Sequence, residues 1–243
     1  MKRKALTLLL AILILATAVT GCGGKDSQAG GDDSTVTVLG SVINETFDPF
    51  TTANMESWVE FALFDHLVRI DENGDPQPML AESWEEGEDG LTITLHLRQD
   101  VKTHDGLEFN ADDVIFSLDT LFASPTNYYL STYMASWEKV DDYTVQVVKG
   151  GAYCKTLEVL ATNCPMVSME AYQELGAEGF AAEPAGTGPY TLVEQGGDNV
   201  VTLQANQDYW NGVPAFETLE VRPPIDMATA VISLQNGELD IVP

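Results

Sequence analysis

The sequence predicts a mixed α/β fold, and three observations support this prediction. In residues 91–97, Leu and Ile alternate with Thr and His, which is the period of a half-buried strand. Residues 110–122 begin with Asn110 and soon reach two acidic residues, which is typical of a capped helix start. Strand-like and helix-like segments alternate along the chain, with some hairpins, as in mixed α/β proteins.

The N-terminus has the parts of an export signal. Three basic residues at 2–4 precede an apolar run at 6–19, which is shorter than the ~20 residues that span a bilayer. The stretch Val-Thr-Gly-Cys at 19–22 resembles the lipobox of bacterial lipoproteins. This resemblance implies that 1–21 are a signal peptide and that the chain is cut before Cys22. The Cys22 sulfur would then carry acyl chains that anchor the protein to a membrane.

A flexible tether is predicted at 22–34, because this segment is rich in Gly, Ser and Asp and has no hydrophobic periodicity. Twelve such residues reach roughly 20 Å on average. We therefore expect an extracytoplasmic protein, in the periplasm or at the cell surface, whose folded part lies close to the membrane.

The folded part is expected to begin with a strand at 34–42 and a helix within 55–70. Residues 71–78 are predicted to form a turn; they do not match a calcium-binding EF-hand loop, because Pro76 stands where that loop needs Gly. After the strand at 91–97 and the helix at 110–122, the patterns predict seven further elements. These are a strand at 141–151, a helix at 154–164, a short helix at 169–180, a hairpin at 186–210, a strand at 216–224, an amphipathic helix at 226–237 and the start of a strand at 238–243.

The charge of the chain excludes several classes of partner. Without the three basic residues of the leader, 8 Lys and Arg remain of 11, against 38 Asp and Glu, for a net charge of −30. Such a protein is not expected to bind nucleic acid or anionic lipid headgroups. The acidic residues are spread along the chain, so a solvated acidic surface is the simplest interpretation.

Cys154 and Cys164 stand at the two ends of a predicted helix. At 1.5 Å per residue, this helix would hold their Cα atoms well beyond the ~7 Å that a disulfide tolerates. Two buried free thiols are therefore favoured over a bridge, and two cysteines alone do not make a zinc site.

Motifs for catalysis, metals and cofactors are lacking. The Ser-x-x-Lys pattern at 136–139 has none of the companion motifs of penicillin-binding enzymes. His66, His96 and His104 fall in three separate elements without metal-ligand spacing, so a solvated or hydrogen-bonded structural role is expected for each. We expect a binding protein without enzymatic activity, without a metal and without a cofactor.

Several motifs together resemble, in order, those of the family 5 extracellular solute-binding proteins, the peptide, dipeptide and nickel receptors of ABC importers. They are FDPF, PQPMLAESWE, LTITLHLRQDVKTHDGLEFNADDVIFSL, GTGPYTL, NQDYW and LQNGELDI, at 47–50, 76–85, 91–118, 186–192, 206–210 and 234–241. The resemblance implies a periplasmic-binding-protein-like fold of type II, with two hinged lobes that close on a ligand. It further implies that this chain holds the first lobe: its core at 35–65, an inserted subdomain at 66–167, and the rest of the core at 168–243, ending at the hinge. The second lobe is absent from this sequence, so we expect either a truncated chain or a half-receptor.

The resemblance also indicates ligand-contacting positions in two loops: Thr52, Ala53, Asn54 and Met55, and Thr126, Asn127 and Tyr128. Amide and hydroxyl groups would orient a ligand, and Met55 and Tyr128 would give adaptable apolar contact. Both segments are equally compatible with ordinary surface loops. The other motif residues are expected to be architectural: Asp105-Gly106 as a turn, Gly186, Gly188 and Pro189 as a bend near the hinge, and Trp84, Tyr209 and Trp210 in packing.

The function expected from the resemblance is capture of oligopeptides or dipeptides outside the membrane and delivery to ABC permease subunits. Nickel chelates or other small solutes on the same fold are an alternative, and so is an extracytoplasmic sensor or chaperone. A secreted hydrolase ranks last, because it would need catalytic residues outside this chain.

Overall fold

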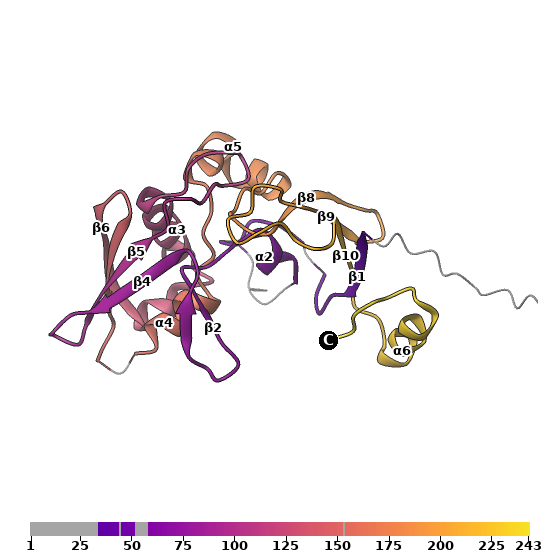
Figure 1. Ribbon diagram of the computed structural model, residues 1–243, viewed down its shortest axis with the longest axis horizontal. Coiled ribbons are helices and arrows are strands. Elements are labelled where there is room, and N and C mark those ends of the chain that lie inside the picture. Colours follow the sequence, from indigo (N-terminus) through magenta and orange to yellow (C-terminus); the bar gives the residue numbers. More distant parts are fainter. Residues whose placement is uncertain (1–33, 44, 52–57, 153) are drawn as a thin grey trace, which may run out of the picture. The chain divides into compact units, whose positions relative to one another are not determined.

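Two four-stranded sheets organise the computed structural model, which describes residues 34–43, 45–51, 58–152 and 154–243 (Figure 1). The first, here the β1 sheet, has the order β1-β10-β9-β8. Its strands are β1 (Thr35–Leu39), β10 (Thr218–Arg222), β9 (Val201–Ala205) and β8 (Tyr190–Gln195). β1 runs parallel to β10 and the other pairs are antiparallel, so the beginning of the described chain pairs with a strand about 180 residues later.

The second sheet, here the β5 sheet, has the order β4-β5-β7-β6 and is antiparallel throughout. Its strands are β4 (Ala81–Glu86), β5 (Thr92–Leu97), β7 (Thr144–Lys149) and β6 (Met134–Asp141). β5 alternates as its sequence predicts: Ile93, Leu95 and Leu97 are buried, and the residues between them are half-buried. Helix α3 (Ala111–Ala123) covers the buried face, where Phe122 and Trp137 have ring centroids 4.5 Å apart.

Shorter elements connect and flank the sheets. Helix α2 (Trp58–Leu63) leads into the hairpin of β2 (Val68–Ile70) and β3 (Pro76–Pro78). The 3₁₀ segment η1 (Tyr128–Thr132) follows α3. The remaining helices are α4 (Thr156–Thr162), α5 (Met169–Ala182), which is interrupted at Gly176 with φ +67°, and α6 (Met227–Asn236).

The helix starts follow from local chemistry. The Asn110 side chain accepts the backbone N–H of Asp112 at 2.8 Å, and the Asp113 carboxylate accepts that of Asn110 at 2.9 Å. This capping box satisfies two of the donors that a helix start leaves unpaired. Asp226 caps α6 in a similar way, accepting the backbone N–H of Thr229 at 3.0 Å, and Gly237 ends that helix in the left-handed conformation.

One hydrophobic core joins the two sheets. It contains buried Val36 and Val221 from the β1 sheet, Leu95 and Val145 from the β5 sheet, and Leu63 from α2. In Figure 1, α2 lies between the two sheets along the horizontal axis. The six residues of α2 are therefore placed where the two halves of the fold meet.

The structure confirms the mixed α/β class and corrects some elements. The helix predicted within 55–70 ends at Leu63, and Val68–Ile70 form a strand that pairs with Pro76–Pro78, inside the segment expected to be a turn. Residues 62–68, including Asp65 and His66, are all buried in the core, which the chain crosses partly in extended form. Strands β4 and β6 are not predicted by the sequence, because most of their residues are exposed and apolar alternation is weak.

The strands of the β5 sheet and the β2–β3 hairpin all fall within 66–167, and those of the β1 sheet fall outside it. The division into a lobe core and an inserted subdomain stays a prediction. In the part of the chain that the structure describes, no helix combines the length and the apolar character that crossing a bilayer requires.

Candidate functional site

A buried carboxylate, Asp65, lies two residues after the end of α2 and contacts distant parts of the chain. It accepts hydrogen bonds from Trp210 Nε1 at 2.8 Å, from Tyr209 Oη at 3.1 Å and from Thr187 Oγ1 at 3.3 Å. Its backbone carbonyl accepts the N–H of Met166 at 3.0 Å. These donors come from the GTGPY and NQDYW motifs, so the two motifs meet at one side chain.

The electrostatics of this junction reflect its burial. Desolvation raises the pKa of Asp65 to about 6, and the three side-chain hydrogen bonds oppose that rise. Arg98, just after β5, lies over the Trp210 ring with its guanidinium carbon 4.4 Å from the ring centroid, and its Nε donates to the Met79 carbonyl at 2.7 Å. The junction thus ties the end of β5 to the segment after β9.

Gly186 and Gly188 allow the chain to approach the end of α2 closely. A Cβ on Gly188 would lie 2.4 Å from the Ala62 carbonyl oxygen, and one on Gly186 would lie 2.2 Å from that of Leu63. The bend near the hinge that the resemblance implies for Gly186, Gly188 and Pro189 stays a prediction. The structure shows instead that Gly186 and Gly188 allow close backbone packing, since neither has a positive φ.

His104 holds the same segment, 186–188, in place. Its Nε2 is 3.0 Å from the Gly188 carbonyl oxygen, and its Nδ1 accepts the Gly186 N–H at 3.2 Å. Burial lowers the pKa of His104, which favours this neutral ring. The expected hydrogen-bonded structural role is confirmed for this histidine.

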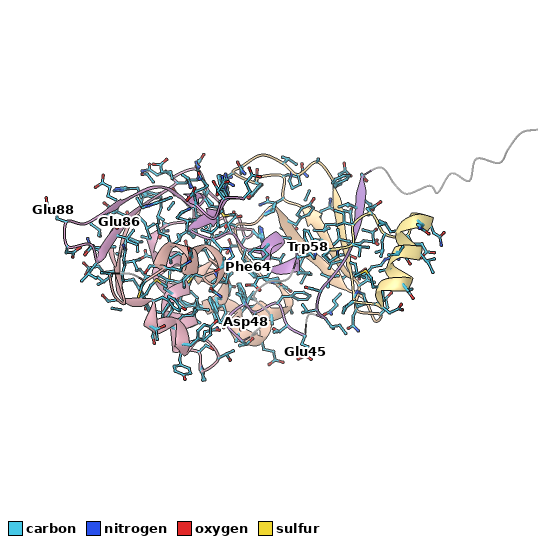
Figure 2. The ribbon with its side chains drawn as sticks, turned by 90° about the horizontal axis from the view of Figure 1, so that it is seen from below. Glu45, Asp48, Trp58, Phe64, Glu86 and Glu88 are labelled. Carbon is cyan, nitrogen blue, oxygen red and sulfur yellow. The ribbon has the colours of Figure 1, made fainter. Side chains whose placement is uncertain are left out.

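Helix α2 itself has two different faces. Val59, Glu60, Ala62 and Leu63 are buried, whereas Trp58 and Phe61 are 40 % and 43 % exposed. Figure 2 labels Trp58 at the start of the helix and Phe64 directly after its end. Burial raises the pKa of the Glu60 carboxyl to about 8, so this acid is protonated at neutral pH.

The predicted loop at 126–128 combines buried and exposed groups. Asn127 is buried, and its Nδ2 has no hydrogen-bond partner among the described residues. Tyr128, which begins η1, is 69 % exposed, and its carbonyl accepts Ser131 Oγ at 2.7 Å. Of the three predicted contact residues, Thr126 and Tyr128 are exposed to a molecule arriving from solvent, and Asn127 is not.

The other predicted site residues lie outside the described residues. These are Thr52, Ala53, Asn54 and Met55, together with the lipidation residue Cys22. Whether the loops at 52–55 and 126–128 lie together stays a prediction.

The described cysteines and acidic residues form no metal centre. Cys154 and Cys164 are free thiols, as the helix between them predicts, but only Cys164 is buried, and the expectation that Cys154 is buried is wrong. Throughout the described ranges, no three His, Cys, Asp or Glu side chains come together as a group that could hold a metal ion.

One cavity of the described chain lies beside the β1 sheet. It measures about 600 Å³ and is lined by both apolar and charged residues. They include Leu39, Ile225 and Leu239, together with Glu194, Glu220 and Arg222. Sequence reasoning did not identify this cavity, because its lining comes from segments far apart in the chain.

The comparisons with known proteins agree on one protein family. Residues 75–243 match the family model described as bacterial extracellular solute-binding proteins, family 5 Middle. The oligopeptide-binding protein AppA of Bacillus subtilis is 30 % identical, with 99 % of this chain and 48 % of AppA covered.

Two solved structures have the same fold over most of this chain. The periplasmic binding protein DppA of Helicobacter pylori, in complex with the peptide STSA, has a TM-score of 0.74 at 27 % identity, with 84 % of this chain and 45 % of that chain covered. NikZ of Campylobacter jejuni, in complex with Ni(L-His), has a TM-score of 0.75 at 28 % identity, with coverages of 86 % and 43 %. The expected periplasmic-binding-protein-like fold is thus confirmed, and the chain spans about half the length of the relatives it matches.

Proposed function

Because the chain belongs to family 5 of the bacterial extracellular solute-binding proteins, we propose that it serves an ABC importer as a peptide-binding component outside the cytoplasm. The observation that carries this proposal is the structural similarity to a family relative solved with a bound peptide. The similarity to an oligopeptide-binding protein along nearly the whole chain supports the same substrate class.

In this proposal the protein binds its ligand and releases it unchanged to permease subunits. Exposed Tyr128 supplies an apolar contact, and Thr126 and Asn127 orient the peptide, as do the residues of the 52–55 loop. Asn127 is buried, and its amide nitrogen has no hydrogen-bond partner among the described residues, so this proposal requires η1 to move before the donor can reach the ligand. In this proposal the buried junction at Asp65 stabilises the fold and does not contact the peptide.

Membrane attachment through Cys22 completes the proposal. Acylation of this residue would hold the binding part near the permease, at the reach of the 22–34 tether. The test is the intact mass of the native protein from its own cells: a lipidated Cys22 gives a mass increase of several acyl chains, and Cys22→Ser abolishes both that increase and membrane fractionation. An unmodified Cys22 would reject the anchor and leave peptide binding standing.

A nickel chelate is the second candidate ligand, since a relative solved with Ni(L-His) has an equally similar fold. No cluster of metal-binding side chains lies within the described ranges, so the protein would have to recognise the chelating molecule rather than the bare ion.

Calorimetry on the complete native protein tests the proposed function. We expect 1:1 binding of short peptides, with the peptide recovered unchanged by mass spectrometry. Binding of nickel-histidine without peptide binding would favour the second candidate, and hydrolysis of the peptide would overturn the proposal of a non-enzymatic receptor.

A further inference from the structure

Two large aromatic side chains, Trp58 and Phe61, stand one turn apart on the same side of α2. Residues three apart on a helix are neighbours, so the two side chains share one face of α2, here the α2 ledge. Both rings are about two-fifths exposed, although the helix otherwise packs firmly into the core through Val59 and Leu63. Single exposed apolar residues need no explanation, but two adjacent aromatic rings on a rigid element are a common form of recognition surface.

The support beneath the ledge is rigid. The backbone of Ala62 and Leu63 is pinned by the close approach of Gly186 and Gly188, and Asp65 follows directly with its three hydrogen bonds. Surfaces carried by such fixed elements lose little entropy when a ligand binds. The ledge is therefore better suited to selecting a ligand side chain than a flexible loop would be.

Two titratable groups beside the ledge, His66 and Glu60, are uncharged at neutral pH. The His66 ring lies 5.6 Å from the Phe61 ring and is buried, and its burial lowers the pKa to about 4, so the ring is neutral at physiological pH. Among the described residues, His66 Nε2 has no hydrogen-bond partner, so the packing next to Phe61 leaves one polar atom unsatisfied. Glu60, the acid on this helix, is buried on its other face and protonated at neutral pH.

The net charge of the chain further restricts the kind of ligand that the ledge could bind. With 38 acidic and 11 basic residues, the protein repels anionic molecules at long range. A neutral ledge in an acidic protein is complementary to an apolar side chain on a peptide that carries no negative side chain.

We propose that the α2 ledge selects peptides with a large apolar or aromatic side chain, which packs on Trp58 and Phe61. This inference rests on the proposed peptide-binding function and makes it more specific. Trp58 and Phe61 are then specificity-determining residues, and acidic side chains are disfavoured at the same position.

The test compares three tripeptides, Ala-Phe-Ala, Ala-Ala-Ala and Ala-Glu-Ala, by calorimetry on the complete native protein. We expect Ala-Phe-Ala to bind roughly tenfold or more tightly than Ala-Ala-Ala, as the burial of one aromatic side chain allows, and Ala-Glu-Ala to bind most weakly. Phe61→Ala and Trp58→Ala should each reduce the preference for Phe over Ala to about threefold or less, with affinity for Ala-Ala-Ala changed less than about twofold. Leu107→Ala is the matched control, because Leu107 is apolar and 42 % exposed outside the ledge.

Each outcome decides a separate point. Loss of the preference in both ledge variants, but not in Leu107→Ala, supports the inference. If the wild-type protein binds peptides but the ledge variants keep the same preference, the ledge is not the selecting surface while the proposed function stands. If the wild-type protein binds none of the three peptides at millimolar concentration, the proposed function itself fails, and this inference fails with it.

Discussion

The two faces of helix α2 have different environments, because one is buried in the core and the other is exposed. The buried face and the end of the helix are held by groups from distant parts of the chain: Gly186 and Gly188 against its backbone, and donors from 187, 209 and 210 on Asp65. The exposed face carries Trp58 and Phe61, whose rings are each about two-fifths exposed. Six residues therefore provide both a structural anchor and an open aromatic surface.

This difference separates the groups that hold the fold together from those that we propose contact a ligand. Groups on the buried face have several partners each, so replacing one of them disturbs several segments at once. Groups on the exposed face have few partners, so they can change without unfolding the protein. The contrast gives an order of expected effects on stability, from the buried glycines down to the ledge.

The largest effect is expected from Gly188→Ala. The new Cβ would lie 2.4 Å from the Ala62 carbonyl oxygen and 2.5 Å from the Leu63 carbonyl carbon, and both belong to backbone that cannot move alone. We expect the free energy of unfolding to fall by about 3 kcal/mol or more, measured by urea denaturation. Gly197→Ala is the control, because nothing lies within 4 Å of its Cβ position, and it should be nearly neutral. Equal stability of the two variants would show that the chain does not approach α2 so closely.

Asp65→Ala should rank second. The substitution leaves Trp210 Nε1, Tyr209 Oη and Thr187 Oγ1 without their acceptor in a buried site, at a cost of about 2–3 kcal/mol in the free energy of unfolding. Asp71 also accepts three hydrogen bonds, from two backbone N–H groups and from Gln77, but it is only half-buried, in the turn between β2 and β3. Asp71→Ala should therefore cost less than about 1 kcal/mol, because water replaces the lost partners. Similar losses in both variants would contradict the special role of the Asp65 junction.

Glu60, on the buried face, predicts a pH dependence of stability. Its pKa is about 8 in the folded protein, against an ordinary value of 4.5. Between these values the folded state holds a proton that the unfolded state releases, so stability decreases as pH rises through this window. The pKa of Asp65 and of Asp113 is raised to about 6, and that of His66 is lowered to about 4 from 6.5. Above pH 6.5 these three groups contribute little further change.

Urea denaturation between pH 6.5 and 8 thus isolates Glu60. We expect the free energy of unfolding to fall by about 2 kcal/mol over this range, at ~1.4 kcal/mol per pH unit. Glu60→Gln, which is neutral at all these pH values, should flatten the decrease. A rise in stability over this range, or an unchanged slope in the variant, would show that Glu60 is ionised in the folded protein.

Local patterns predicted the elements that depend on neighbouring residues. The capping box of α3 and the alternation in β5 are both visible in the sequence, because the interacting groups lie within a few residues of one another. The same holds for α4, whose length separates Cys154 from Cys164.

The junction at Asp65 could not be predicted from local patterns. Its donors are 122, 144 and 145 residues away, and nothing near Asp65 marks it as buried. The resemblance placed Tyr209 and Trp210 in packing, and the structure adds the carboxylate that they share. The ledge was missed for a related reason: the dense apolar run at 58–64 suggests a broadly buried helix, and only the fold shows that Trp58 and Phe61 remain exposed.

The smallest effect on stability is expected at the ledge. Phe61→Ala and Trp58→Ala should each lower the free energy of unfolding by about 1 kcal/mol or less, because both rings are already partly in water. Urea denaturation of these variants, beside Gly188→Ala and Asp65→Ala, gives the direct comparison of the two faces. Ledge variants that lose as much stability as Asp65→Ala would mean that the aromatic rings hold the fold together, and the contrast between the faces of α2 would disappear. Ledge variants that keep their stability but lose the preference for Phe-containing peptides would assign the exposed face to ligand selection.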